Sequence, residues 1–437
     1  MRATNVNPQI TRPAEPAEAP ASGRAGRLSG LARGFRALQV RNYRLYWIGQ
    51  LISQTGSWMQ TTAQAWLVLQ ITQSPFALGL VTTLQFLPIM LLSLLGGAIS
   101  DRWPKHRLIL VTQTAALIQA AVFGALVATG AIQLWHVYVL APIQGVITAI
   151  DNPTRQAFAV ELVGREHLVN AVALNSMLFN GARIIGPALA GLIIAKIGIA
   201  PTLFLNAISF VAVIVGLLMM DPSAFFNPPP AQRGSTGRNI VEGLAYVWRT
   251  PPVLLVMIIV AAIGTFGYNF SVVLPLLAGF VLHTDASGFG GLSAFLGVGS
   301  LVGALATAYT RTINVRRLVI GAGCFGVLLG AVALSTNFAL SGALLIALGF
   351  AGITFATSAN SLLQLSVPDA LRGRVMGLYM LLFAGTTPIG GFLIGTLSNA
   401  IGVSWTLLIC AGLCLLGVGG ALVYRWTSRQ LPVASGQ

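Results

Sequence analysis

Residues 76–129 read FALGLVTTLQFLPIMLLSLLGGAISDRWPKHRLILVTQTAALIQAAVFGALVAT, a pattern that is typical of membrane proteins. Two apolar runs, 76–99 and 108–129, flank a short loop that holds several Arg and Lys residues. Each run is long enough to cross the hydrocarbon core of a bilayer as a helix, which takes about 20 residues. The stretch therefore predicts two membrane-spanning helices that are joined on one side of the membrane.

The same pattern recurs along most of the 437 residues. Hydrophobic residues make up 55% of the chain and charged residues 8%, and the mean hydropathy is +0.81. Because an ordinary soluble protein has roughly 25% charged residues, this composition excludes a soluble enzyme, a coiled coil and a disordered chain. We expect an all-α integral membrane protein with twelve spans, at 45–71, 76–99, 108–129, 135–156, 168–196, 200–219, 253–279, 287–309, 317–338, 340–361, 373–398 and 402–424.

The spans and the polar stretches between them divide the chain into five expected segments. These are a disordered basic tail, 1–44; a six-helix half, 45–220; a polar connector, 221–252; a second six-helix half, 253–425; and a short tail, 426–437. Within the connector, residues 239–249 mix apolar and charged side chains in a pattern typical of a helix at a membrane surface. A plain linker is the alternative.

The positive charge of the chain lies almost entirely on one side of the predicted membrane. Of the 25 Lys and Arg residues, 23 fall in the tails and in the loops on one side, and the exceptions are Arg183 and Lys196. Since positively charged loops stay in the cytoplasm, we expect both termini there, in a multi-pass protein of a bacterial inner membrane. The net charge of +15 is therefore a topology signal, and no nucleic-acid partner is expected.

Sequence patterns of catalytic and metal sites are missing from the chain. The three Cys residues lie within apolar runs, and there is no CxxC pair, Walker A sequence, HExxH or GxSxG. We therefore expect no metal, no cofactor and no catalytic residue, and the chain is not expected to be an enzyme.

The chain also contains an internal repeat. At an offset of 204 residues, six positions carry the same residue, namely Leu174, Phe179, Gly181, Gly186, Gly191 and Gly198, which match Leu378, Phe383, Gly385, Gly390, Gly395 and Gly402. Two halves that arose by duplication are typical of transporters, which bind their substrates near the membrane midplane between the repeats.

Polar residues within the first predicted span lie on one helical face. They are spaced by 4, 3, 4 and 3 residues, and they are Gln50, Gln54, Ser57, Thr61 and Gln64. Such a face lines a wet cavity or bonds across helices, and we favour the cavity. From the other half, Tyr268 and Asn269 are expected to face it, beside a helix break at Gly264 and Gly267.

Two charged residues stand out in the predicted spans, namely the one basic residue at mid-span and the one acidic residue that any of the spans contains. Arg183 is near mid-membrane, where a charge costs about 3 kcal/mol or more, so we expect it to face the cavity and attract an anionic or phenolic substrate group. The alternative is a structural arginine that is satisfied by backbone carbonyls, Asn180 or water. Asp151 is the candidate for proton coupling, and the alternative is a gate ion pair with Arg102 or Arg155.

The loop between the second and third spans has a specific spacing, G-x-x-x-D-R-x-x-K, at Gly97, Asp101, Arg102 and Lys105. It resembles motif A of the major facilitator superfamily, with Pro104 in place of the usual glycine. The resemblance implies a gating role, in which Asp101 faces the positive end of the eleventh span and helps to close the cytoplasmic side. An ordinary basic loop is the alternative.

The fifth span contains Gly186, Pro187 and Gly191, and the pattern resembles motif C, the signature of exporters in the same superfamily. Ala190 stands where the family has a further glycine, and helix packing alone is the alternative. The stretches Asp151-Asn-Pro-Thr-Arg155 and Arg41-Asn-Tyr-Arg44 resemble the branch that contains the enterobactin exporter and macrolide-efflux permeases. The resemblance covers roughly residues 37 to 425.

These observations predict the major facilitator fold and a secondary active transporter. We expect export of small amphipathic organic molecules, siderophore-like or drug-like, by alternating access and proton antiport. The expected partners are the small-molecule substrate, the proton gradient and the lipid bilayer, with a monomer favoured. The alternatives are an uptake permease for a small metabolite and a non-transporting membrane receptor or assembly partner.

Overall fold

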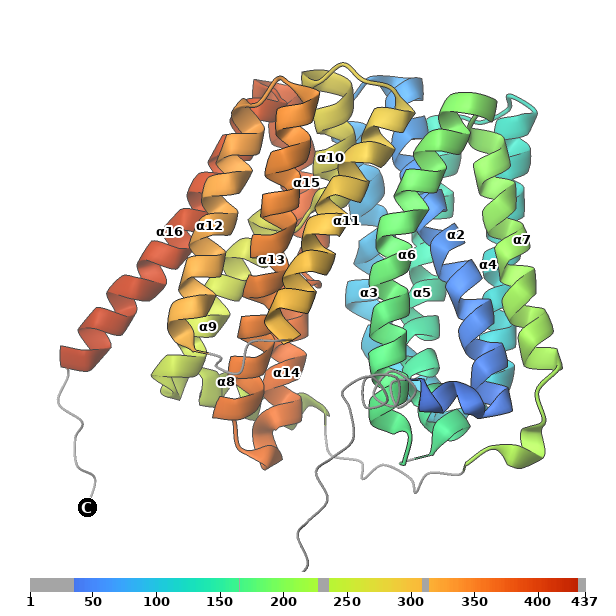
Figure 1. Cartoon of the computed structure of the whole chain (residues 1–437), viewed down its shortest axis with the longest axis horizontal. Helices are drawn as coiled ribbons and strands as arrows, with labels where there is room; N and C mark the ends of the chain where they lie inside the picture. Colours follow the sequence, from blue (N-terminus) through green and yellow to red (C-terminus); the bar gives the residue numbers. More distant parts are fainter. Residues whose placement is uncertain (1–34, 165, 227–235, 309–313, 431–437) are drawn as a thin grey trace, which may run out of the picture.

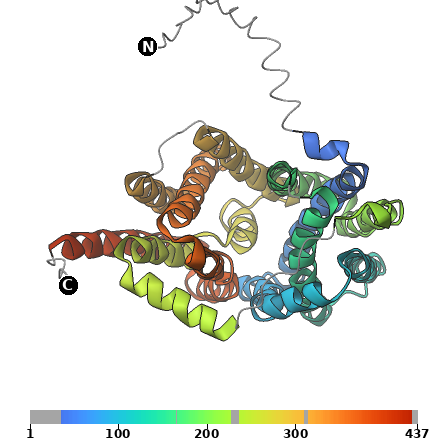
Figure 2. The same ribbon diagram turned by 90° about the horizontal axis from the view of Figure 1, so that it is seen from below.

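The computed structural model describes residues 35–164, 166–226, 236–308 and 314–430, and within them the chain forms helices and no strand. The helices gather in two bundles that stand side by side, one formed by the N-terminal part of the chain and the other by the C-terminal part (Figure 1). Seen along the bundle axis, the two groups of helices lie on opposite sides of the molecule (Figure 2). This is the two-half arrangement that the internal repeat predicts.

The N-terminal half begins within the expected tail. Arg36–Gln39 forms a short 3-10 helix, η1, and buries Ala37. Six long helices follow, which are α2 (Arg41–Thr72), α3 (Pro75–Arg102), α4 (Lys105–Ala128), α5 (Leu134–Val163), α6 (Leu168–Ile197) and α7 (Ile199–Leu218). Residues 36–39 and 41–44 of the expected tail are therefore helical, because apolar side chains at this end pack on the bundle. Residues 1–34 of the expected tail lie outside the described residues.

The connector forms two helices in its described part, η2 (Pro222–Ala224) and α8 (Thr236–Arg249). The expected surface segment, 239–249, is thus helical. α8 lies crosswise at the outer edge of the C-terminal half (Figure 2). Its Leu244 and Trp248 side chains are exposed, whereas Val247 is buried.

The C-terminal half contains two spans that are interrupted. Its elements are α9 (Pro251–Ala262), η3 (Ile263–Gly267), α10 (Phe270–Leu276), η4 (Leu277–Val281), α11 (Ala286–Ala308), α12 (Val315–Leu334), α13 (Phe338–Ser366), α14 (Asp369–Phe383), α15 (Thr387–Ile401) and α16 (Val403–Gln430). The expected span 253–279 is divided by the π-helix η3, and the span 373–398 is divided between α14 and α15. The rest of the expected tail, 431–437, lies outside the described residues.

Among the described residues, eleven segments are long and apolar enough to cross a membrane. α2 is not one of them, although it has 32 residues and lies within the N-terminal half. Its polar face lowers its mean hydropathy, so hydropathy alone does not count it as a span. The helical membrane fold is as expected, and the twelfth span rests on the position of α2 in the bundle.

The two halves touch at one end of the molecule, where α3 and α11 begin, and we call this the closed end. There a Cβ on Gly79 would lie 2.7 Å from the Cα of Gly395 in α15, and one on Gly191 would lie 2.9 Å from the Cα of Gly290 in α11. Such distances leave room only for hydrogen, so the backbones approach as closely as small residues allow. The opposite end, which carries Arg102, Lys105 and α8, is called the basic end.

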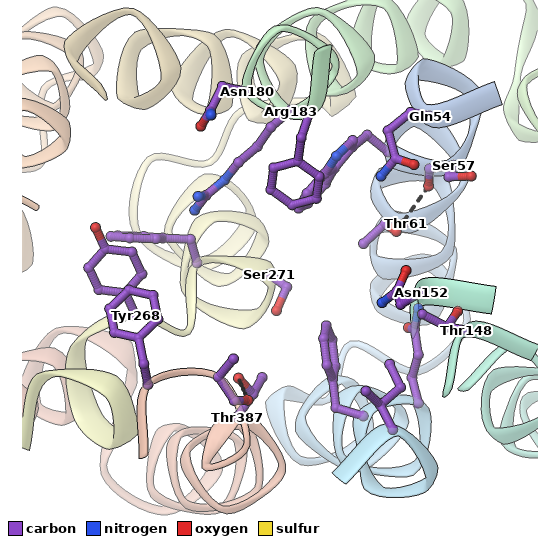
Figure 3. Close-up of a pocket in the computed structure, with 18 of the residues that line it drawn as sticks. Gln54, Ser57, Thr61, Thr148, Asn152, Asn180, Arg183, Tyr268, Ser271 and Thr387 are labelled. Atoms are coloured by element: carbon purple, nitrogen blue, oxygen red, sulfur yellow. Dashed lines mark hydrogen bonds between the residues drawn. The ribbon is translucent and has the colours of Figure 1, made fainter. Parts of the chain in front are cut away.

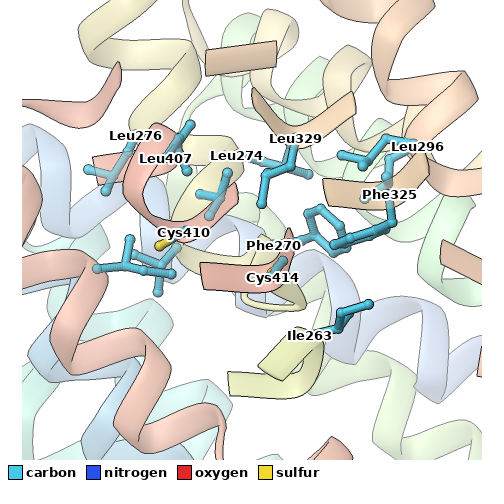
Figure 4. Close-up of a cluster of buried hydrophobic side chains, with 14 of the residues drawn as sticks. Ile263, Phe270, Leu274, Leu276, Leu296, Phe325, Leu329, Leu407, Cys410 and Cys414 are labelled. Carbon is cyan, nitrogen blue, oxygen red and sulfur yellow. The ribbon is translucent and has the colours of Figure 1, made fainter. Parts of the chain in front are cut away.

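An apolar core fills the C-terminal half behind the broken helix. Ile263 and Phe270 pack there with Phe325 of α12 and with Cys410 and Cys414 of α16 (Figure 4). Both cysteines are buried and free, as the apolar runs around them predict. The core holds η3 and α10 in place against their neighbours.

Candidate functional site

A cavity of about 1680 Å³ lies between the two halves and is lined by side chains of both. Towards the basic end its wall reaches Arg155 of α5 and Asp369 of α14. Towards the closed end it reaches Pro187 and Phe289, close to the glycine contacts between the halves. Phe289 also stacks on Trp66 of α2, with 6.2 Å between the ring centroids. The closed end is thus sealed by backbone contacts and a pair of stacked rings.

Four of the five stripe residues of α2 line this cavity, namely Gln54, Ser57, Thr61 and Gln64. The Ser57 and Thr61 hydroxyls donate to backbone oxygens one turn earlier, as Figure 3 shows for Thr61. The Gln64 amide donates to the side chain of Gln85 in α3 at 2.9 Å. The cavity wall on this side therefore consists of amides and hydroxyls whose hydrogen bonds are satisfied in part within the protein.

Gln50, the first residue of the stripe, lies outside the cavity wall. Its side chain is buried, and its Oε1 accepts a hydrogen bond from Arg155. The position differs from the expectation because a charged partner on α5 draws the Gln50 amide into the helix interface.

Arg183 projects from α6 into the cavity (Figure 3). Its guanidinium carbon lies 5.8 Å from the centre of the Trp58 ring, within the range of a cation–π contact. One turn earlier on α6, Phe179 meets the same Trp58 ring edge-on, at 5.9 Å between centroids. Gly186 lets this packing form, because a Cβ there would lie 2.6 Å from the Cβ of Trp58.

Tyr268 enters the cavity from the opposite half at the break that follows η3 (Figure 3). Its ring contacts Phe325 and Phe383, with centroids 5.5 and 4.8 Å apart. Its hydroxyl lies over Gly352 of α13, where a Cβ would be only 2.9 Å away. The break at Gly264 and Gly267 therefore places an aromatic side chain in the cavity wall.

Asn269, the neighbour of Tyr268, is placed differently from the expectation. Its side chain is 1% exposed and is not part of the cavity wall. The Nδ2 atom donates to the Thr265 carbonyl at 2.7 Å, and Gly390 of α15 packs against it. Consecutive residues point in different directions, so only one of the two faces the cavity.

Asp151 joins a buried polar network at the basic end of the cavity. Its Oδ1 accepts hydrogen bonds from Thr112 at 2.6 Å and from Gln113 at 3.1 Å, both on α4. Its Oδ2 forms an ion pair with Arg155, one turn later on α5. The carboxylate is 6% exposed and contributes to the cavity wall. Its cationic partner is thus Arg155, the second of the two expected candidates.

The residues of the motif A loop lie at the basic end of α3 and α4, away from the cavity wall. Asp101 and Arg102 are exposed, and a Cβ on Gly97 would meet no atom within 4 Å. Lys105 forms an ion pair with Glu161 of α5 at 3.1 Å. The loop therefore has room to meet another surface at the basic end.

The residues of motif C connect three helices. Gly186 contacts α2, as described above, whereas Gly191 and the Pro187 carbonyl lie against Gly290 of α11. Ala190, which replaces a glycine of the family pattern, is fully buried. Motif C thus packs the cavity wall and also forms part of the closed end.

Sequence reasoning missed several residues of the site. Trp58 lines the cavity and lies on the same helix as the polar stripe. Thr387 also lines it and is the repeat equivalent of Arg183, so a comparison of the two repeats would find it. Ser271 and Asn152 also line the cavity (Figure 3). Within the described residues, no group of three His, Cys, Asp or Glu side chains is placed to hold a metal ion.

Comparison with protein families gives a match over nearly the whole chain. The sequence profile of the transmembrane secretion effector family matches residues 32–434. This range includes every helix that the structure describes.

Three curated relatives have similar sequences. The staphyloferrin A transporter of Staphylococcus aureus is 25% identical over 86% of this chain and 94% of its own length. The multidrug efflux pump Tap of Mycolicibacterium fortuitum is 27% identical over 88% of this chain and 96% of its own. The enterobactin exporter EntS of Citrobacter koseri is 24% identical over 87% of this chain and 92% of its own.

Solved structures resemble the fold at low sequence identity. The nucleoside transporter NupG aligns with a TM-score of 0.71 and 12% identity, over 88% of this chain and 99% of its own. An inward-facing bacterial homologue of the human lysosomal transporter Spinster aligns with a TM-score of 0.68 and 12% identity, over 89% and 98%. These similarities concern the fold alone.

Proposed function

The chain belongs to the transmembrane secretion effector family of the major facilitator superfamily, and from this membership we propose that it exports small amphipathic organic molecules by alternating access. The observation that carries the proposal is the cavity of about 1680 Å³ between two repeats that touch at the closed end. A space of this size holds a drug-sized or larger molecule. Its mixed wall of amides, hydroxyls and aromatic rings suits cargo that has both polar and apolar parts.

The direction of transport follows from the charge distribution. Positively charged loops remain in the cytoplasm, so the basic end faces the cytoplasm, as do both termini, in a bacterial inner membrane. The cavity wall extends to that end, which supports cargo entry from the cytoplasm. The named relatives that export siderophores or drugs, and the exporter signature at Gly186, Pro187 and Gly191, favour export over uptake.

The gate of the proposed cycle lies at the basic end. When the two halves approach there, the exposed Asp101 meets the start of α14, where the positive end of a helix dipole attracts a carboxylate. Gly97 leaves space beside it for this approach. At the closed end, Gly191 and Gly395 must separate from their partners in the same step.

Proton antiport supplies the energy in this proposal, with Asp151 as the coupling group. It is the acid that lies within a membrane helix and also lines the cavity. Its ion pair with Arg155 and its bonds to α4 connect a change of its charge to the packing of α4 and α5. The exporter acts as a monomer, since one chain encloses the whole cavity.

Inside-out membrane vesicles test this function. We expect energised vesicles to accumulate at least one dye from a panel of anionic, neutral and cationic amphipathic dyes, and collapse of the pH gradient to stop it. Asp151→Asn abolishes the dependence on the gradient, whereas Glu166→Gln, which removes an exposed acid away from the cavity, leaves it unchanged. Transport of no dye, or transport out of the vesicles, contradicts the proposed exporter.

A further inference from the structure

The charged side chains that line the cavity do not balance one another. Five of them contribute to the wall, namely Asp151, Arg155, Arg183, Asp369 and Arg374. Four have an ion-pair partner: Asp151 and Arg155 pair with each other, Asp369 pairs with Arg372, and Arg374 pairs with Glu242. Within the described part of the chain, Arg183 has no carboxylate partner. The wall therefore carries one uncompensated positive charge.

This charge lies away from water-exposed loops. Arg183 is in the middle of α6 and half-buried, between the basic end and the closed-end contact at Gly191. Its described contact is the face of the Trp58 ring. A guanidinium at membrane depth is stabilised by a partner of opposite charge, and the ring supplies only part of that stabilisation.

The repeat shows that the charge belongs to one half only. The position equivalent to Arg183 is Thr387, which lines the same cavity with a hydroxyl (Figure 3). Phe179 and Phe383 are also equivalent, and both line the cavity. The two walls thus share an aromatic surface, but the cation without a carboxylate partner among the described residues is on one of them only.

Aromatic rings surround the space in front of the guanidinium. Trp58 and Phe179 lie beside it, and Tyr268 stands across the cavity with Phe270 and Phe383 at its edges. Such faces bind planar apolar groups. A guanidinium binds the two oxygens of a carboxylate in a bidentate manner, and it also donates charge-assisted hydrogen bonds to sulfonate or phenolate oxygens. The aromatic faces and the Arg183 guanidinium are therefore next to each other in the cavity wall.

We infer that Arg183 and Trp58 form an anion-binding subsite, and that the exported molecules are aromatic or otherwise planar amphiphiles with a negatively charged group. This inference rests on the proposed transport function and names its substrate class. A cationic amphiphile is repelled by the unpaired guanidinium, and a neutral one leaves it without a partner. The subsite therefore selects cargo by charge.

A matched set of three naphthalene compounds tests the subsite. They are 2-naphthoate, the neutral 2-naphthamide and the naphthalen-2-yl-trimethylammonium cation, and their binding to the purified full chain in detergent is measured by isothermal titration calorimetry. We expect naphthoate to bind at least tenfold more tightly than the other two. Arg183→Gln removes this preference, Arg183→Lys keeps part of it, and Arg316→Gln, which removes an exposed arginine outside the cavity, leaves it unchanged.

Other results overturn the inference. Equal binding of the three compounds, a preference for the cation, no measurable binding of naphthoate, or a preference that survives Arg183→Gln each shows that the guanidinium is structural. Thermal unfolding of each variant confirms that it is folded. Transport in liposomes separates this inference from the function: a naphthoate preference without any transport contradicts the exporter, whereas transport of all three compounds at equal rates contradicts only the subsite.

Discussion

Asp151 is a buried carboxylate with both hydrogen-bond donors and a cationic partner. Its carboxylate has two hydrogen-bond donors on α4 and one cationic partner on α5, and all of them are largely buried. Loss of one partner from a buried ion pair leaves the other charge uncompensated, which is costly, whereas loss of both is cheaper. Asp151, the proposed proton site, therefore ties α5 to α4 through its hydrogen bonds and pairs with Arg155 within α5.

A double-mutant cycle measures the coupling between Asp151 and Arg155. We expect Asp151→Leu to destabilise the protein by about 3 kcal/mol, because the Arg155 charge remains buried. Adding Arg155→Leu restores part of the loss. Thermal unfolding of the single and double variants in detergent ranks their stabilities. The same substitutions in the exposed pair Asp369–Arg372 serve as the control and should change the stability by less than about 1 kcal/mol. A double variant that is less stable than Asp151→Leu alone shows that the two residues do not act as a pair.

Gly352 sets the position of the Tyr268 ring. In Gly352→Ala the new methyl group lies 2.9 Å from the Tyr268 hydroxyl and 3.2 Å from the Phe325 ring. We expect the tyrosine to shift further into the cavity, and binding of naphthoate to weaken by about 1 kcal/mol, the lower range for overpacking. Calorimetry with Gly323→Ala as the control, where a Cβ meets no atom within 4 Å, checks this. Unchanged affinity in Gly352→Ala contradicts a role for Tyr268 in the wall.

At the residue scale, helical periodicity predicted the part of the cavity wall that α2 supplies, with one exception. Residues 54, 57, 61 and 64 of α2 share one face, and this face lines the cavity. The same reasoning included Gln50, and the expected helix break included Asn269, but both side chains turn to partners on neighbouring segments. Those partners, Arg155 and Thr265, were in the sequence, but their proximity depends on how the helices pack.

At the scale of the secondary-structure elements, two membrane-spanning segments of the C-terminal half are interrupted. The break around η3 follows from glycines that fit against neighbouring backbone and rings, since a Cβ on Gly264 would lie 3.0 Å from the Cα of Phe383. Glycines in the sequence made this break predictable. The sequence does not predict the break between α14 and α15. The equivalent helix of the other repeat, α6, continues through Gly186 and Pro187 without interruption. The stretch Gly385-Thr-Thr-Pro388 places its proline three residues earlier relative to the repeat.

The glycine crossings of α6 with α11 and of α3 with α15 are the contacts that hold the closed end. In Gly191→Ala the added methyl lies 2.5 Å from the Ala286 carbonyl oxygen and 2.9 Å from the Cα of Gly290, so the helices must move apart. We expect this end to open, and spin labels on the exposed residues Ala131 and Thr336 to report longer distances.

Gly412→Ala is the matched control for this experiment, because a Cβ at Gly412 of α16 meets no atom within 4 Å. The labels are placed in a background in which the three native cysteines are replaced. Identical distance distributions in Gly191→Ala and Gly412→Ala contradict the view that the glycine crossing holds the end closed.

At the scale of the whole molecule, a negatively charged cargo makes the proposed transport cycle depend on the membrane potential. An anion that leaves the negative side of a membrane gains about 2.3 kcal/mol per charge for each 100 mV. Export of an anion and entry of a proton both make the inside of the cell more positive. The membrane potential therefore drives the proposed cycle in addition to the pH gradient.

Potassium diffusion potentials in liposomes check this consequence. With valinomycin present and the potential negative on the side of the basic end, we expect naphthoate to leave that side faster than at zero potential. Reversal of the potential slows the movement. Liposomes that contain Arg183→Gln serve as the control, and a rate that is independent of potential contradicts the transport of a charged molecule.

Alternating access is the central claim, and distances between the halves at both ends test it most directly. Spin labels at Glu166 and Leu365 report on the basic end, and labels at Ala131 and Thr336 report on the closed end, all at exposed positions. Under conditions of transport, we predict that a population appears with shorter distances at the basic end and longer ones at the closed end. Distances that stay fixed at both ends, or that lengthen at both together while cargo moves, contradict the mechanism.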